Sequence, residues 1–162
     1  MNKLNWVRCD SRSDMMSRLS HINDNVFDEL ITDDPNTWGF FISEKKDICI
    51  PLGFCDIGLP PQFFIQNMII FIGVSELVVG YDLKTGTMIF KYKMPTVFHE
   101  FSGLGESGVI LQDETGFVGL SNDGTQKWIK LFSDVISCYL IIGNTISGKA
   151  EDGEQFEFSI PI

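Results

Sequence analysis

The stretch that decides the fold is residues 68–90, MIIFIGVSELVVGYDLKTGTMIF. Its apolar start, Met68–Val74, is far shorter than the roughly 20 residues that a helix needs to cross a bilayer, so it is predicted to be a buried strand. Ser75-Glu76 then separates it from a second apolar run, and a turn ending in Gly86 precedes a third. Short apolar runs separated by turn residues predict antiparallel strands joined by hairpins.

The same pattern recurs twice further along the chain. The second copy runs from 109 to 128 and the third from 138 to 156, and their turns carry Gly124 and Gly153, as the first carries Gly86. Asp-Gly favours a tight hairpin turn because glycine adopts a positive φ without strain. The repeat predicts an antiparallel meander across most of the chain.

These units resemble the blades of quinoprotein-like (PQQ-type) β-propellers. Residues 80–90 are similar to the blade signature Ala-Leu-Asp-x-x-Thr-Gly-x-x-x-Trp, with Phe90 in place of the Trp, and Trp128 retains that Trp in the second unit. The resemblance covers about residues 66–160. It implies an open, propeller-like stack of hairpins or a twisted sandwich, because so few units do not close a ring. It implies no quinone cofactor, since so short a chain forms no multi-blade funnel to hold one.

The first 35 residues have a helical pattern instead. The apolar residues that recur three and four positions apart are Met15, Leu19, Ile22, Val26 and Leu30. Ser11 with Asp14 is typical of a helix N-cap, and Pro35 cannot continue a helix. Asn23-Asp24-Asn25 is expected to divide the segment into two short helices.

We therefore expect a mainly β (α+β) fold in a single domain over 1–162, with a helical segment at 1–35 and a β-rich region at 38–162. A hairpin is expected where Trp38–Ser43 meets Ile48–Pro51. The glycines and prolines of residues 51–61 predict a loop, and Gly103–Gly108 predicts a connection between units.

The chain is strongly acidic. Twelve Lys and Arg against 22 Asp and Glu give a net charge of −10 and a pI near 4.5. Phosphate backbones and anionic membranes repel such a surface, so nucleic-acid and membrane partners are excluded and a basic protein partner is favoured. Residues 19–44 and 95–126 contain no Lys or Arg. These stretches are either a solvated surface that keeps the protein soluble or a docking face for a cationic protein.

In the docking alternative, carboxylates enter the basic cleft of the partner and exposed aromatic residues anchor it. The candidate partner-binding residues are Asp28, Glu29, Asp33, Asp34, Trp38, Glu106, Asp113, Glu114 and Phe117.

The sequence offers no catalytic set, no cofactor and no metal site. His99-Glu100 is a weak acid–base candidate, because adjacent residues on a strand point to opposite faces. The four cysteines, Cys9, Cys49, Cys55 and Cys138, form no Cys-x-x-Cys pair, and the last three are expected to be buried thiols. The N-terminal residues have no apolar signal region, so a cytoplasmic location is expected.

Two functions follow as hypotheses. The first is a small acidic cytoplasmic protein that neutralises a basic partner, similar in character to the bacterial immunity proteins that block nuclease toxins of contact-dependent growth inhibition. The second is a propeller-like scaffold that binds a peptide at a strand edge. An enzyme would need a polar pocket around His99 or His21, which the sequence does not reveal.

Overall fold

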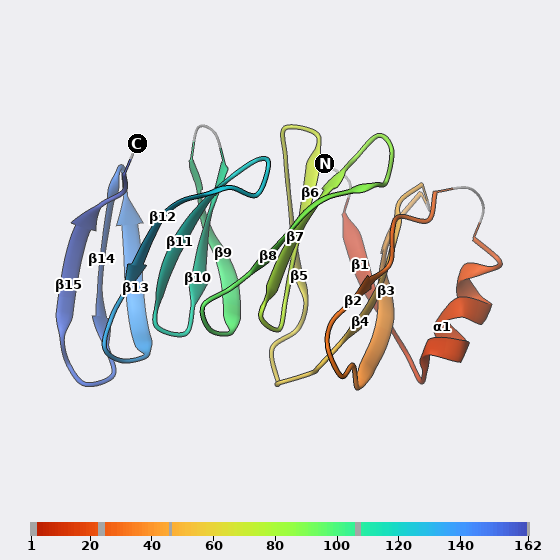
Figure 1. Cartoon of the computed structure of the whole chain (residues 1–162), viewed down its shortest axis with the longest axis horizontal. Coiled ribbons are helices and arrows are strands. Elements are labelled where there is room, and N and C mark those ends of the chain that lie inside the picture. Colours follow the sequence, from red (N-terminus) through yellow and green to blue (C-terminus); the bar gives the residue numbers. More distant parts are fainter. Residues whose placement is uncertain (1–2, 23–24, 46, 106–107, 162) are drawn as a thin grey trace.

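The fold is mainly β, as expected, and consists of four small sheets in a row with one short helix at one end (Figure 1). The computed structural model describes residues 3–22, 25–45, 47–105 and 108–161. We call the sheets blades 1 to 4 in chain order. Blade 4 has three strands, and each of the other three blades has four.

Helix α1 (Arg12–Leu19) follows the first strand. Blade 1 has the order β1-β3-β4-β2, with bounds β1 (Leu4–Cys9), β2 (Leu30–Ile31), β3 (Thr37–Ser43) and β4 (Cys49–Phe54). In the other blades, neighbours in sequence are neighbours in the sheet. Blade 2 consists of β5 (Gln62–Gln66), β6 (Ile69–Val74), β7 (Leu77–Asp82) and β8 (Met88–Lys93). Blade 3 consists of β9 (Phe98–Gly105), β10 (Gly108–Asp113), β11 (Gly116–Ser121) and β12 (Gln126–Leu131). Blade 4 consists of β13 (Ile136–Ile142), β14 (Thr145–Ala150) and β15 (Gln155–Ser159).

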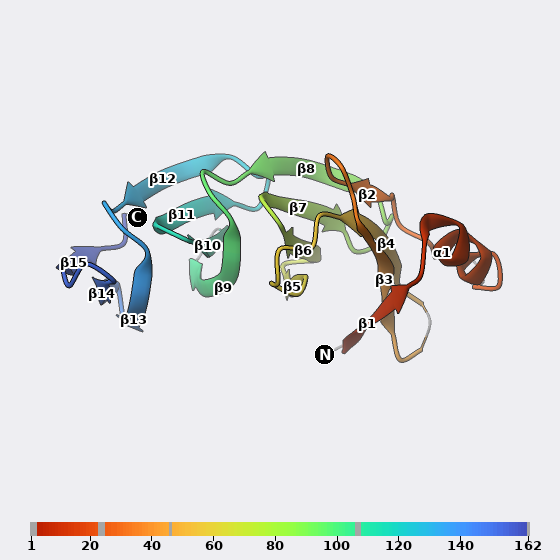
Figure 2. The ribbon, with the colours of Figure 1, turned by 90° about the horizontal axis from the view of Figure 1, so that it is seen from below.

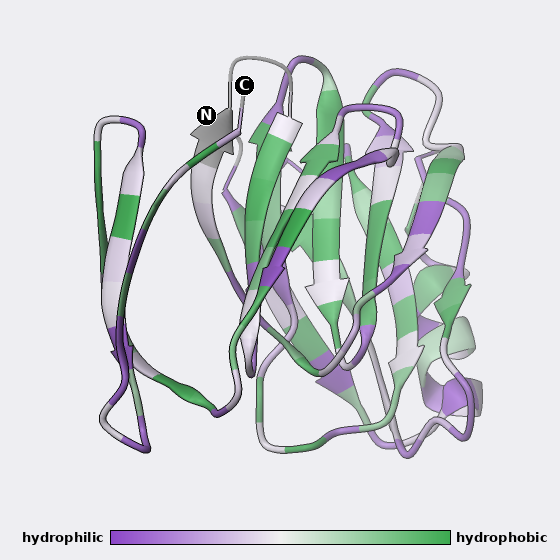
Figure 3. Cartoon of the chain, turned by 60° about the vertical axis from the view of Figure 1, so that its left-hand side comes forward, coloured by the Kyte–Doolittle hydropathy of each residue, from purple (hydrophilic) through white to green (hydrophobic). Residues whose placement is uncertain are grey.

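The blades stand face to face along an open arc. Figure 2 shows β1, β5, β9 and β13 on the concave side and β2, β8 and β12 on the convex side. In Figure 3 the hydrophobic residues are concentrated in the strands and the hydrophilic ones in the turns. The expectation of an open, propeller-like stack is therefore confirmed.

Each buried apolar cluster joins two successive layers. In β6, Ile70 and Ile72 pack toward blade 1, whereas Phe71 between them packs toward blade 3. In β10, Ile110 packs toward blade 4 and Leu111 toward blade 2. Alternate side chains of a strand point to opposite faces, so a strand between two blades is apolar at every position. This explains the apolar run Ile69–Val74, whereas Met68, predicted to belong to the same buried strand, lies in the turn before it and is 60% exposed.

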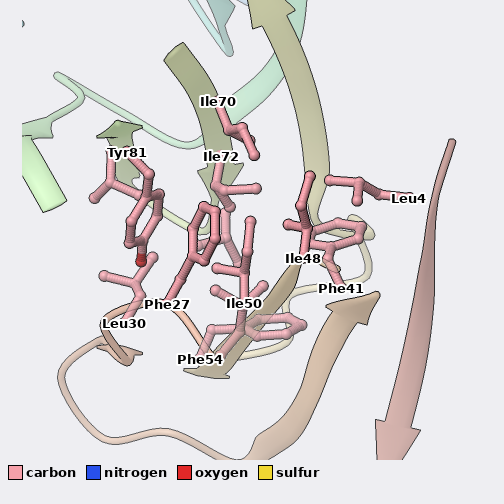
Figure 4. Packing of buried hydrophobic residues seen from close by; sticks show 13 residues of the cluster. Leu4, Phe27, Leu30, Phe41, Ile48, Ile50, Phe54, Ile70, Ile72 and Tyr81 are labelled. Carbon is pink, nitrogen blue, oxygen red and sulfur yellow. The ribbon is translucent and has the colours of Figure 1, made fainter. Parts of the chain in front are cut away.

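The cluster between blades 1 and 2 combines distant parts of the chain. Phe27 and Leu30 pack beside Ile50, and Ile72 and Tyr81 reach them from blade 2 (Figure 4). All five side chains are buried. Removing apolar surface from water contributes roughly 25 cal/mol per Å², so the burial of these side chains holds blades 1 and 2 together.

The repeat that the sequence predicts recurs in the strand register. Gly80 lies opposite Phe90, and Gly119 lies opposite Trp128. In both pairs the aromatic ring lies on the glycine, so an added Cβ would be 2.2 Å from a ring atom. The glycine is needed because the ring occupies the space of a side chain.

The helical prediction for residues 1–35 is wrong over most of its length. The helix covers only Arg12–Leu19, where Met15 and Leu19 are buried against blade 1. Ser11 is its N-cap as predicted, since its Oγ accepts from Asp14 N at 3.1 Å. Residues 4–9 and Leu30 are in strands, because pairing with β3 and β4 satisfies their backbone groups. Two residues of the expected helix break, Asn23 and Asp24, lie outside the described residues.

Two predicted connections are also strands. The hairpin of β3 and β4 is confirmed, but β4 continues to Phe54, through part of the expected loop. Cys49 N donates to Asn25 O, so it points away from β3, and the nitrogen of Pro51 two residues later points the same way. Strand β2 lies on that side but pairs with β4 only from Leu52 onward. Pro51 is therefore tolerated, because no ladder hydrogen bond needs its missing N–H. Most of Gly103–Gly108 belongs to β9 and β10. Strand β5 has no counterpart in the sequence prediction.

Candidate functional site: the outer edge of blade 4

Blades 3 and 4 have equivalent backbone hydrogen bonds between a turn and the link that precedes the blade. In blade 3, Glu114 N on the β10–β11 turn donates to Val97 O on the link that precedes β9 (3.2 Å). In blade 4, Glu151 N on the β14–β15 turn donates in the same way to Val135 O on the link that precedes β13 (2.8 Å). Strands β13, β14 and β15 therefore occupy the positions that β9, β10 and β11 occupy in blade 3.

The position of each strand in blade 4 therefore differs by one strand from the position that the sequence repeat predicts. The sequence pattern aligns β14 and β15 with β11 and β12, and Gly148 does lie opposite Phe156 as Gly119 lies opposite Trp128. In space, however, β15 takes the place of β11. Within the described residues, blade 4 thus has no counterpart of β12, and the outer edge of β15 is unpaired.

The backbone groups at this edge can be assigned. Ile160 N donates to Asn144 O (2.8 Å) and Ala150 N donates to Glu154 O (2.9 Å). Hydrogen-bonded pairs alternate along an antiparallel ladder, so Phe156 and Phe158 also direct their backbone groups to β14. The backbone groups that face outward belong to Gln155, Glu157 and Ser159. They form a row of donors and acceptors that a further strand could pair with.

The inner side of the edge is aromatic. Phe156 and Phe158 point toward blade 3, where both lie near Phe117, with ring centroids 6.2 and 5.9 Å away. The Phe158 ring also lies 6.2 Å from the ring of Trp128 on β12. A side chain added beside β15 would therefore contact a preformed apolar wall.

The solvent side of the edge is polar and acidic. Gln155, Glu157 and Ser159 are exposed there. At the turn end, the Ser133 hydroxyl lies 3.1 Å from a Glu154 carboxylate oxygen and 3.4 Å from an Asp152 oxygen. Asp152 also accepts from Glu154 N at 2.8 Å, which fixes the turn.

The rest of the outer face of blade 4 is divided by strand. Leu140 and Ile142 on β13 are 57% and 67% exposed, an apolar strip on the concave side. Cys138 beside them is exposed, so its predicted burial is wrong, because within the described residues no element covers this face. The opposite end of the arc differs: α1 covers the outer face of blade 1, with Met15 fully buried.

Two of the predicted partner-binding residues are buried. Asp113 and Phe117 are both 0% exposed, so the expectation that they lie on the surface is wrong. Phe117 is at the centre of the aromatic cluster between blades 3 and 4, and the Asp113 carboxylate accepts from Thr115 N to close the β10–β11 turn. Both serve the packing of the fold.

The other predicted residues lie in different blades. Asp28 accepts from Met88 N (2.8 Å) and so joins blade 1 to blade 2, and Glu29 pairs with Arg12 of α1 (3.0 Å). Asp33 and Asp34 are exposed between β2 and β3. Of the remaining candidate partner-binding residues, Trp38 is half-buried over Gly53 and Glu114 is half-buried on the β10–β11 turn. Glu106 lies outside the described residues. Among the described residues, the candidates of the first acidic stretch therefore lie around blade 1, whereas Glu114 of the second lies on blade 3.

The candidate acid–base residues are not assembled into a site. His99 contributes its backbone oxygen to Gln62, and Glu100 accepts from the Tyr139 hydroxyl across blades 3 and 4. Among the described residues there is no group of three or more His, Cys, Asp and Glu that could hold a metal ion. In the same part of the chain, no helix is long and apolar enough to span a membrane.

Comparison with known proteins informs the fold alone. No family model and no curated protein matches the chain. The crystal structure of the computationally designed Ika4 protein is similar, with a TM-score of 0.54 and 8% sequence identity. The match covers 86% of this chain and 94% of that one. It supports the arrangement of four small antiparallel sheets as propeller-like blades.

Proposed function

We propose that this protein is an interaction module that binds an extended segment of a partner protein at the outer edge of β15. The observation that carries the proposal is that β15 takes the place of β11, whereas no described strand takes the place of β12. An added strand gains main-chain hydrogen bonds at Gln155, Glu157 and Ser159. It also covers the aromatic wall formed by Phe158 and Trp128.

The site lies on a rigid base. Ile146 of β14 is fully buried against blade 3, and Phe132 stacks on Phe156 with centroids 4.1 Å apart. The edge is therefore held in extended form before the partner arrives, which reduces the entropy that binding must overcome.

The test compares Glu157→Pro with Glu157→Ala. Both remove the carboxylate, but only proline removes the outward N–H, and neither disturbs the pairing of β15 with β14. The probe is a nine-residue peptide in which lysine alternates with valine and alanine. We expect the peptide to slow amide exchange at Glu157 and Ser159 in the wild-type protein, to bind Glu157→Ala, and to lose most of its affinity for Glu157→Pro.

Three results would overturn the proposal. One is peptide binding without protection of these amides, and the second is equal binding by the proline and alanine variants. The third is a stable dimer that Glu157→Pro dissociates, because a second copy would then occupy the edge. The folding of each variant is checked by its circular dichroism spectrum and its urea midpoint.

We also propose, as a second function, that the protein neutralises a basic protein partner such as a bacterial nuclease toxin. The support is the net charge of −10 and the position of Glu114, Asp134, Glu151 and Asp152 on connections at one end of blades 3 and 4. Coexpression with a nuclease encoded by a neighbouring gene tests it. A complex that protects the host and weakens as salt rises is expected, and a nuclease that remains active would refute it.

A further inference from the structure

We infer that the segment bound at β15 alternates basic residues with small or apolar ones. This inference rests on the proposed function and specifies the chemistry of the partner. It follows from what each face of the β15 edge offers to the residues of an added strand. Side chains of the added strand would alternate between the solvent side of blade 4 and the side that faces blade 3.

On the solvent side, the added residues would lie beside Glu157 and Gln155. Glu157 is exposed, and its neighbour across the β14–β15 ladder is Ser147; Lys149 lies on the same face opposite Gln155, but among the described residues it forms no ion pair with Glu157. Toward the turn the edge continues into Glu154 and Asp152. Opposite charges across a strand pair attract each other, so lysine or arginine is favoured at these positions.

On the side that faces blade 3, the available space differs from that in blade 3 itself. On β11 the glycine Gly119 accepts the ring of Trp128. In β15, by contrast, Phe158 faces back toward blade 3, as Leu120 of β11 faces blade 2, whereas Gly119 faces blade 4. The Phe158 ring already fills part of the space beside Trp128. The added residue opposite Phe158 would therefore lie beside two aromatic rings, where a small or medium apolar residue such as alanine or valine fits better than an indole.

The outer strand of blade 2 has the same alternation. In β8, Phe90 and Tyr92 are half-buried, whereas Lys91 and Lys93 between and after them are exposed. Strand β12 departs from this alternation, because Lys130 shares the face of Trp128 and the exposed Ile129 and Leu131 share the face of Lys127. In blade 2, lysine is thus the residue that this fold itself places on the exposed side of an outermost strand, where it also prevents edge-to-edge aggregation.

A second copy of the chain fits the edge less well. Antiparallel pairing of two β15 strands about their centre would place Glu157 opposite Glu157. Like charges directly opposite each other destabilise a strand pair. In this register the large ring of Phe158 would also lie opposite Phe156 of the second copy rather than opposite a small residue.

The experiment titrates the protein with two matched peptides while amide exchange at Glu157 and Ser159 is followed by NMR. The first peptide is the lysine, valine and alanine probe, and its twin carries glutamate at every lysine. We expect the lysine peptide to bind about two- to fivefold more tightly for each charge pair formed. This preference should shrink at high salt. A third peptide, with tryptophan in place of the central alanine, should bind more weakly than the first.

The variant Glu157→Lys provides the reciprocal arm, and Glu44→Gln, an exposed carboxylate on the turn of blade 1, is the matched charge control. Glu157→Lys should reverse the preference between the two peptides, and Glu44→Gln should leave it unchanged. If both peptides protect the edge equally, the proposed strand addition holds and the basic alternation is refuted. If neither peptide protects the edge, the proposed function fails as well.

Discussion

The indole of Trp128 on β12 lies directly on Gly119 of β11, so that a Cβ at residue 119 would be 2.2 Å from the indole nitrogen. Phe90 covers Gly80 in the same way in blade 2. In blades 2 and 3, an aromatic residue on the outermost strand therefore requires a glycine opposite it on the neighbouring strand.

Gly119→Ala should destabilise the protein by about 1–3 kcal/mol, because the indole must move out of a well-packed position. Urea unfolding measures the change. Gly103→Ala is the control, since a Cβ there would meet its nearest atom at 3.4 Å, an ordinary van der Waals contact. Equal destabilisation by the two variants would contradict this account of the glycine.

Phe117→Ala should cost about 3–5 kcal/mol of stability, since the ring is fully buried among Tyr139, Phe132, Phe156 and Phe158. The measurement is again the free energy of unfolding. A surface anchor would behave differently, because its loss would weaken partner binding and leave the urea midpoint in place.

Asp28→Ala should destabilise by about 1 kcal/mol, because it leaves the Met88 amide that now donates to the carboxylate without its acceptor. Asp28→Asn should restore most of this loss, since the side-chain oxygen can still accept. If the asparagine variant is as unstable as the alanine variant, the charge of Asp28 matters more than this hydrogen bond.

Stability should fall as the pH drops from about 4 toward 2 in part because of Asp123. The Ser121 hydroxyl, followed by the Thr125 amide, lowers the pKa of Asp123 to about 2. A carboxyl whose folded pKa lies below its unfolded value stabilises the folded state above the unfolded pKa, and this contribution is lost as the pH falls through the folded pKa. Asp123→Asn should flatten this acid limb in urea unfolding measured against pH.

Tyr139 should act at the alkaline end. Burial, and then the hydrogen bond to Glu100, raise the pKa of Tyr139 to about 12. The folded state therefore holds this proton more tightly than the unfolded state, and the stability it adds is present below about pH 10 and lost as the pH rises through 12. Tyr139→Phe should remove the step near pH 12 from the tyrosinate absorbance titration of the folded protein, whereas Tyr81, whose pKa burial raises further, should still titrate after it. An unchanged titration curve would contradict this assignment.

The apolar runs and their turns carried the prediction of the fold. Strands such as β6 are recognisable from sequence because both faces are buried between blades. Strands β1 and β2 are not, because their conformation depends on pairing with β3 and β4, which lie far along the chain. Local helical spacing at Val26 and Leu30 gave the wrong structure for the same reason.

The candidate site was harder to predict. Its character depends on which strand of blade 4 is the outermost, and the sequence pattern of Gly148 and Phe156 aligns β15 with the wrong strand of blade 3. The hydrogen bond from Glu151 N to Val135 O, which matches that from Glu114 N to Val97 O, reveals which strands correspond. The charge count gives the net charge of −10, but it contains no information on the burial of Asp113.

The clusters that join only neighbouring layers have a consequence for how the protein melts. Blade 4 is held by one apolar interface, whereas blades 2 and 3 are each held by two and blade 1 is held by α1 as well as blade 2. In such a linear array, cooperativity passes from neighbour to neighbour, and the end with one interface opens first. Unfolding is thus expected to travel from the C-terminal blade toward the helix, and a ligand held at β15 would delay its start.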